Sequence, residues 1–126
     1  MPTKFSITRD INGYNGFGLK PSDTNVNTTL TANTDTTYTI PGNTAIGGCN
    51  VATTQNPTML AIFYYTPGTE VWVAVNATAN VPAGATFAAT SSEGNPAAWE
   101  VKGGDVIHCK TAATGVSVGI RLYWLT

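Results

Sequence analysis

Short segments that alternate apolar and polar residues run along most of the chain, and residues typical of turns separate them. The clearest example is "EVWVAVNA" (residues 70–77), in which three valines alternate with Trp72, Ala74 and Asn76. A period of two places alternate side chains on opposite faces of a strand, and the helical period is almost absent. The pattern predicts an all-β domain of roughly eight to nine short strands, typical of a single antiparallel β-sandwich or jelly roll.

Two of the predicted strands have distinctive patterns. The segment "MLAIFYYTP" (59–67) is apolar on both faces, which indicates a central strand. The last segment (116–126) alternates and places five apolar residues on one face: Val116, Val118, Ile120, Leu122 and Trp124. We expect segments 26–32 and 36–41 to form a hairpin-like pair. The other expected strands cover residues 45–53, 70–77 and 85–91, with two more inside 98–111 around the Gly103–Gly104–Asp105 turn.

Residues 1–24 have a different composition from the rest. The stretch "DINGYNGFGLKPSD" is dense in Gly and Asn, which favours a loop or an extended arm over regular structure. We therefore predict an irregular N-terminal arm (1–24) followed by one β-sandwich domain (25–126). Tyr14 and Phe17 need an apolar environment, either on the domain itself or on a neighbouring molecule.

Composition narrows the possible partners. Apolar residues make up 42% of the 126 residues, enough for a core, whereas charged residues make up only 10%. The net charge of -1 and the absence of a basic stripe argue against nucleic acid. The chain has no apolar run of signal-peptide or membrane-spanning length, so we expect no membrane partner and synthesis in the cytoplasm. A neutral surface of Thr, Asn and Ser suits close protein contact, because little charge must be desolvated.

The sequence offers little catalytic or metal-binding chemistry. The single histidine, His108, has Asp105 three residues away and Cys109 beside it, and in a strand both would point to the opposite face. We expect a half-buried or interface histidine, and no catalytic residue, cofactor or metal. Only convergence of His108, Asp105 and a distant carboxylate in one pocket would favour an enzyme. Cys49 and Cys109 are expected to be reduced.

Several aromatic residues and turns admit more than one interpretation. Tyr64, Tyr65, Trp72, Trp99 and Trp124 could form a sugar-binding platform, although packing in the core or in a subunit interface is favoured. The turns in "VPAGATF" and "GNPAAW" are interpreted as scaffold features.

These turns also carry a resemblance. "VWVAVNATANVPAGATFAATSSEGNPAAWEVKGGDVIHCKTAATGVSVGIRLYWL" resembles the C-terminal part of small structural proteins of tailed-bacteriophage virions. In those proteins a "V-x-V-A-x-N" strand leads into "P-A-G-x-x-F", a small-residue loop ending in "N-P-A", then "V-K-x-G-D-V-I" and a final alternating strand. "TLTANTDTTYTIP" is similar to a segment near the start of such domains, so the resemblance covers roughly residues 28–125.

The resemblance implies a capsid decoration (cement) protein on the outside of the virion head, often trimeric, that binds the major capsid protein and bridges its subunits. The alternative is a head-fibre or tail-fibre module that attaches to a glycan on the host cell. Three regions are the expected contacts: the arm, the small-residue loop with its end, and the last strand, at the trimer axis or in the core. Their residues are Tyr14, Phe17 and Leu19; Pro82, Phe87, Asn95 and Trp99; and Tyr123 and Trp124.

Overall fold

The part of the chain that the structure describes contains ten β-strands. The computed structural model describes residues 3–9, 11–41, 58–82, 84, 87 and 89–125, except the side chains of Asn15 and Phe17. These residues form no helix, and so none that could cross a membrane. The strands are β1 (Ile7–Arg9), β2 (Asn15–Leu19), β3 (Asn25–Thr29), β4 (Thr36–Thr39), β5 (Thr58–Tyr65), β6 (Trp72–Val75), β7 (Glu93–Gly94), β8 (Ala98–Lys102), β9 (Val106–Lys110) and β10 (Ser117–Trp124).

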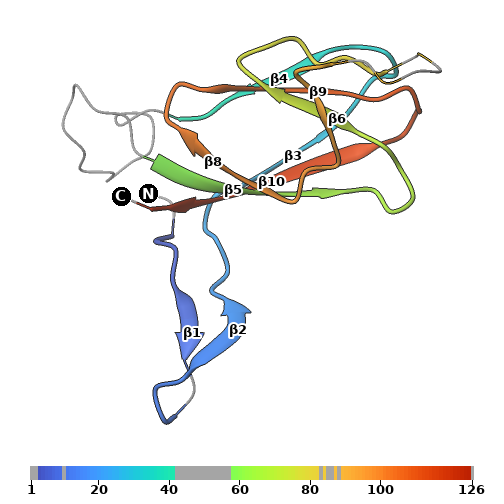
Figure 1. Ribbon diagram of the computed structural model, residues 1–126. Helices are drawn as coiled ribbons and strands as arrows, with labels where there is room; N and C mark the ends of the chain where they lie inside the picture. Colours follow the sequence, from blue (N-terminus) through green and yellow to red (C-terminus); the bar gives the residue numbers. More distant parts are fainter. Residues whose placement is uncertain are drawn as a thin grey trace.

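Eight of these strands form a sandwich of two antiparallel sheets (Figure 1). The strand orders are β3-β10-β5-β8 and β4-β9-β6-β7. From β3 to β10 the chain therefore crosses to the other sheet at every connection except the one between β6 and β7. This arrangement of eight strands in two interleaved four-stranded sheets is the jelly roll. The predicted all-β antiparallel sandwich is therefore confirmed.

The core lies between the two sheets. The central strand predicted at residues 59–67 is confirmed, because β5 lies between β10 and β8 and pairs with β10 from Met59 to Tyr65. The inner faces of the two sheets meet in one buried cluster. Its largest fully buried members are Ile40, Met59, Ile107, Leu122, Val71, Val73, Val101 and Val116.

The hairpin predicted for residues 26–32 and 36–41 is wrong. β3 pairs with β10, and β4 pairs with β9, so the two segments lie in different sheets. The connection between them crosses the sandwich, where the buried Leu30 donates its N–H to Val116 O (2.8 Å) and Asn33 donates to Thr111 O (2.7 Å). Partners more than 70 residues along the chain outcompete the local pairing, because they let Leu30 enter the core.

The strand predicted at residues 85–91 is also wrong where the structure describes it. Phe87 and residues 89–91 form no strand, and Phe87 is fully exposed. The strand next to β6 at the edge of the β4-β9-β6-β7 sheet is instead the two-residue strand β7, which pairs with Trp72 and Val73. Small residues in this segment bury little apolar surface, so pairing gains little there. The strand expected at 45–53, with Cys49, lies outside the described residues.

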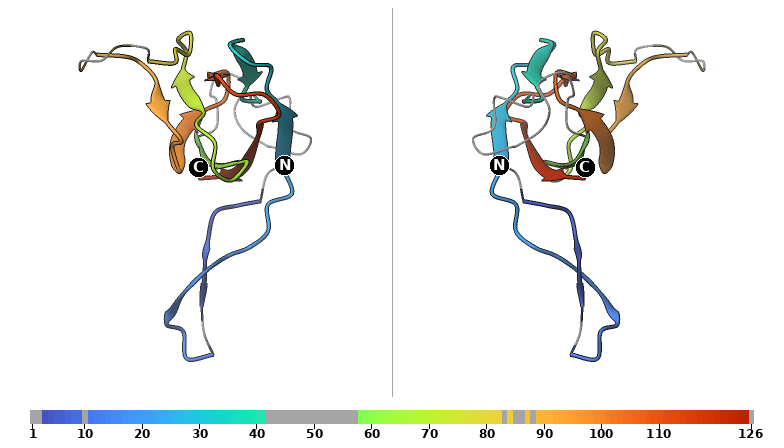
Figure 2. Two further views of the ribbon diagram at one scale, coloured as in Figure 1. Left: turned by 90° about the vertical axis from the view of Figure 1, so that its right-hand side faces the viewer. Right: turned by 90° about the vertical axis from the view of Figure 1, so that its left-hand side faces the viewer.

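The N-terminal arm is not irregular, as the sequence suggested, but a two-stranded hairpin that projects from the sandwich (Figures 1 and 2). β1 and β2 are antiparallel, with Ile7 opposite Leu19. Thr8 Oγ1 donates to Gly18 O (3.0 Å). A Cβ added at Gly16 would lie only 2.8 Å from Thr8 Oγ1. The glycines that argued against regular structure therefore permit the close approach of the two strands.

Both strands of the arm are fixed at their base to the end of β10. Phe5 N–H donates to Trp124 O (2.9 Å), and Trp124 N–H donates to Thr3 O (3.0 Å). On the returning strand, Ser22 Oγ donates to Leu122 O (2.6 Å), and the hydroxyl of the buried Tyr123 donates to the carbonyl of Lys20. The direction in which the arm leaves the sandwich is set by these contacts.

Two Leu→Ala substitutions test this division into core and arm. Leu122→Ala empties a fully buried position, so we expect the free energy of unfolding to fall by about 2–5 kcal/mol. Leu19→Ala removes the same atoms from a side chain that is 37% exposed on the arm, and we expect a change within about 0.5 kcal/mol. Urea unfolding of both variants measures the difference; equal losses would contradict the placement of Leu19 outside the core.

Candidate functional site

The arm exposes several large apolar side chains. At its tip Ile11 is 100% exposed and Tyr14 is 72% exposed, and nearer the base Ile7 and Leu19 form an exposed cross-strand pair. An isolated two-stranded hairpin is at best marginally stable in water. A hairpin that also exposes large apolar groups gains stability when another surface covers them. We call Ile7, Ile11, Tyr14 and Leu19 the arm patch.

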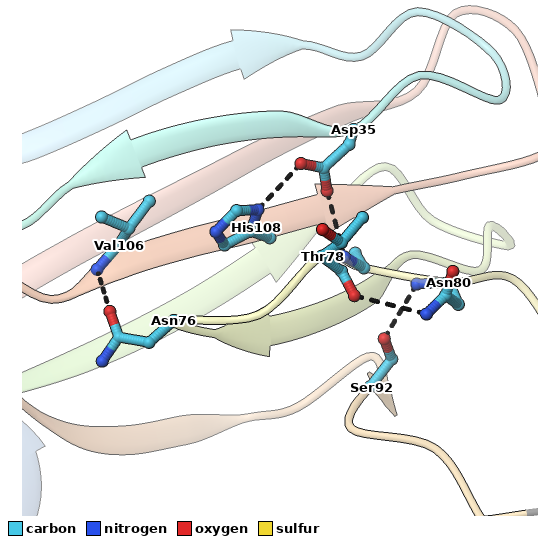
Figure 3. A network of polar contacts seen from close by, with 8 residues as sticks. Asp35, Asn76, Thr78, Asn80, Ser92, Val106 and His108 are labelled. Carbon is cyan, nitrogen blue, oxygen red and sulfur yellow. Dashed lines mark hydrogen bonds and ion pairs between the residues drawn. The ribbon is translucent and has the colours of Figure 1, made fainter.

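A second candidate is the polar network on the outer face of β9 (Figure 3). His108 Nδ1 lies 2.8 Å from Asp35 Oδ2, and the other carboxylate oxygen of Asp35 accepts the N–H of Ala79 (3.1 Å). Beside them, the N–H of Asn80 donates to Ser92 Oγ (2.9 Å). The network joins the turn before β4, strand β9 and both ends of the loop between β6 and β7.

Asn76 fixes the start of the same loop. Its backbone has φ 57°, its Oδ1 accepts the N–H of Val106 (2.9 Å) and its Nδ2 donates to Asp105 Oδ1 (3.1 Å). Asp105 also accepts the N–H of Lys102 (3.0 Å), which closes the turn between β8 and β9. Asp105 is thus a turn residue, as expected, and the carboxylate partner of His108 is Asp35.

The Asp35–His108 pair ties the start of the loop to β9. An Asp that fixes His Nδ1 is one half of a nucleophile-activating arrangement, which also needs a Ser, Cys or Thr near Nε2. The hydrogen bonds within the described residues bring no such group to Nε2, and His108 is only 18% exposed. The same part of the chain contains no group of three His, Cys, Asp or Glu side chains that could hold a metal ion.

The predicted interface residues Asn95 and Trp99 make contacts within the chain. Asn95, with φ 45°, accepts Val71 N–H on its Oδ1 (2.6 Å) and donates from Nδ2 to Thr69 O (2.8 Å). Trp99 donates from Nε1 to Glu93 Oε2 (2.9 Å), and its ring packs edge-on against Phe63 at 5.5 Å between centroids. The "GNPAAW" turn is therefore a clamp that holds the segment before β6.

The other predicted interface residues fall into two groups. Tyr123 is buried at the base of the arm, where it packs edge-on against Phe5, and Trp124 is half-buried, its Nε1–H without an acceptor among the described residues. Pro82 and Phe87 are exposed on the long loop. Tyr14 and Leu19 belong to the arm patch, while the side chain of Phe17 lies outside the described part of the structure.

A third candidate is an apolar cleft of about 240 Å³ between the two sheets, at the side where β3 and β4 are the edge strands. Val26, Val118 and Ile120 line it from one sheet, and Tyr38 and Cys109 line it from the other. The sandwich is thus not fully closed along this side, and part of the core faces the opening.

The backbone of β3 contributes to the same side. Leu30 N–H donates to Val116 O (2.8 Å) and Leu122 N–H donates to Thr24 O (3.0 Å), so the even-numbered residues of this strand bond to β10. In an antiparallel ladder the residues between them direct their N–H and C=O groups outward. Asn25, Asn27 and Thr29 therefore present polar backbone groups along an edge without charged side chains, which natural proteins normally protect.

We expect Asp35→Ala to release the long loop. The substitution removes the acceptor of Ala79 N–H and of His108, so the free energy of unfolding should fall by about 1–3 kcal/mol, and cleavage by a protease within residues 76–92 should accelerate. Asp23→Ala is the control, because the Asp23 carboxylate accepts only from the exposed neighbouring Thr24 among the bonds described. Equal cleavage rates in the two variants would contradict the role of Asp35.

The cleft thiol gives a prediction about pH. Burial, and secondarily the negative charge of Asp35, raises the pKa of Cys109 from 9.0 to about 12. Since the thiolate is the reacting form, the alkylation rate of folded Cys49→Ser protein should rise about tenfold per pH unit up to pH 10 without levelling off. Mass spectrometry after timed iodoacetamide treatment measures this rate. A plateau near pH 9, as in the urea-unfolded control, would contradict the raised pKa.

Comparison of the chain with models of known protein families, with curated protein sequences and with solved structures found no match.

Proposed function

We propose that this protein is a structural component of a tailed-bacteriophage virion that binds the outer surface of the assembled head and stabilises it. The observation that carries the proposal is the arm: a hairpin fixed at its base to β10, with large apolar side chains exposed beyond the sandwich. The resemblance of residues 28–125 to small virion proteins supports the same function. Jelly rolls serve many functions, so the fold alone does not carry it.

The arm patch suits a protein partner. Ile11 and Tyr14 lie at the tip, where they can enter an apolar recess between neighbouring shell subunits. Burying an exposed Ile side chain contributes about 1.5–3 kcal/mol, which is of the size expected for one principal contact of an interface. A protein that binds the assembled shell but not its free subunits stabilises the shell by mass action.

Self-association is part of the proposal, with the β3–β4 side as the contact between copies. This side combines an apolar cleft with outward-directed backbone groups, and no described strand pairs with its outer edges. A second copy that covers it would bury the cleft and satisfy the edge. In a trimer three arms would bind together, and multivalency would convert weak single contacts into stable attachment.

Co-sedimentation with undecorated, expanded heads of the parent phage tests the proposal. We expect saturable binding at a fixed ratio to the major capsid protein, and heads that withstand a higher temperature. Ile11→Ser should weaken binding at least tenfold because it removes an apolar contact at the arm tip. Tyr64→Ser is the control, since Tyr64 is an exposed aromatic side chain on β5, outside the arm and outside the other expected contact regions.

One result would remove the arm from this proposal, and a second would overturn the function. Equal binding of Ile11→Ser and wild-type protein to heads would exclude the arm tip as the attachment point. Absence of head binding, together with saturable binding to host cells, would favour the fibre-type attachment module instead.

A further inference from the structure

A separate recess of about 220 Å³ lies at the end of the sandwich away from the chain termini. The turn between β5 and β6 (Gly68–Glu70) forms one wall, and Thr111–Ala113 after β9 forms another. Trp72 of β6 and Val81 of the long loop complete it. The recess shares no residue with the arm patch or with the β3–β4 cleft.

The indole of Trp72 is held in place on one side. A Cβ added at Gly94 would lie 3.2 Å from Cη2 of Trp72 and 3.3 Å from its Cζ3, so the ring lies directly on the Gly94 backbone. The ring is half-buried and also lines the recess. Trp72 is thus a fixed aromatic surface that remains in part accessible.

The walls of the recess are also fixed. Asn95 clamps Thr69 O and Val71 N–H, and the hydroxyl of the buried Thr111 donates to Glu70 O (2.8 Å). The hydroxyl of Thr69 donates to Thr66 O (2.6 Å). Because the proton of Thr69 Oγ1 is used within the chain, this oxygen is available to a ligand only as an acceptor, beside the exposed carboxylate of Glu70. Such a pre-formed site costs little ordering on binding.

We propose that this recess binds one neutral sugar ring. The C–H face of a pyranose can lie on the indole of Trp72, while its hydroxyls donate to the carboxylate of Glu70 and to Thr69 Oγ1. A volume of about 220 Å³ is below the roughly 300–1,000 Å³ of drug-sized pockets, which fits one ring rather than an oligosaccharide.

The charge of the lining selects a neutral sugar over an acidic one. Glu70 is the one charged residue among those that line the recess, and it would repel a sugar carboxylate. Lys110 lies opposite Trp72 in the register of β9 and β6, but it does not line the recess.

An NMR titration with isolated sugars tests the site without any phage component, so its outcome is independent of the shell-binding proposal. The probes are the methyl glycosides of glucose, galactose, mannose and N-acetylglucosamine, each raised to about 50 mM, because single-ring sites bind in the millimolar range. We expect at least one to give saturable shifts of the Trp72 indole N–H and of amides in residues 68–72 and 111–113. Trp72→Phe identifies that indole signal.

Glu70→Ala should weaken the binding at least fivefold, because it removes the carboxylate that accepts from the sugar hydroxyls. The fold should be retained, because the side chain is exposed and the bond from Thr111 goes to the backbone of residue 70. Glu100→Ala, an exposed glutamate on β8, is the matched control and should bind as the wild type does. The proposal is overturned if none of the glycosides saturates, if Glu70→Ala binds as tightly as wild type, or if methyl glucuronide binds more tightly than the neutral sugars.

Discussion

The pairing of β10 with its two neighbours is the interaction on which the rest of the molecule depends. β10 bonds to β3 on one side and to β5 on the other, and its inner face supplies Val118, Ile120 and Leu122 to the core. Its last residues also hold both strands of the arm through Trp124 and Tyr123. A register shift of one residue would reverse the two faces of the strand and would disrupt the core and the base of the arm together.

Asparagine residues fix several of the turns between strands, through their backbone conformation and through side-chain hydrogen bonds to backbone groups. The described non-glycine residues with positive φ are Asn33, Asn76 and Asn95, and all three lie at turns between strands. Asn76 and Asn95 also bond through their side chains to backbone groups of neighbouring segments. Asn tolerates this backbone region and supplies both a donor and an acceptor, so turns are fixed while the surface stays nearly uncharged.

The sequence predicted those features that depend on local pattern. Alternation located β6, β8, β9 and β10 to within a few residues, and the continuous apolar run located β5 and identified it as an inner strand. Pairing was not predictable in this way, because almost every connection crosses between sheets. The local hairpin inferred for residues 26–41 therefore failed. The arm was misjudged because its glycines permit a close strand pair as readily as they permit a loop.

The candidate sites were predicted only in part. Tyr14 and Leu19 were identified as apolar residues of an arm rich in Gly and Asn, and the structure exposes both on the arm patch. The Asp35–His108 pair was missed because 73 positions separate the two residues, and only the register of β4 with β9 brings them together. Similarly, Glu70 and Trp72 are only two positions apart, but nothing in the sequence joins them to Thr111 until β6 pairs with β9.

The position of β10 along the chain has a consequence for how the protein is made. A ribosome completes β3 and β5 before it reaches residues 117–124, and until then the two strands lack the neighbour that lies between them. The growing chain must keep their edges from pairing with other chains, and its neutral Thr- and Asn-rich strands offer little charge repulsion against such pairing. Since the sheet closes from its centre at the last step, folding is expected to be slow and limited by contacts between distant segments.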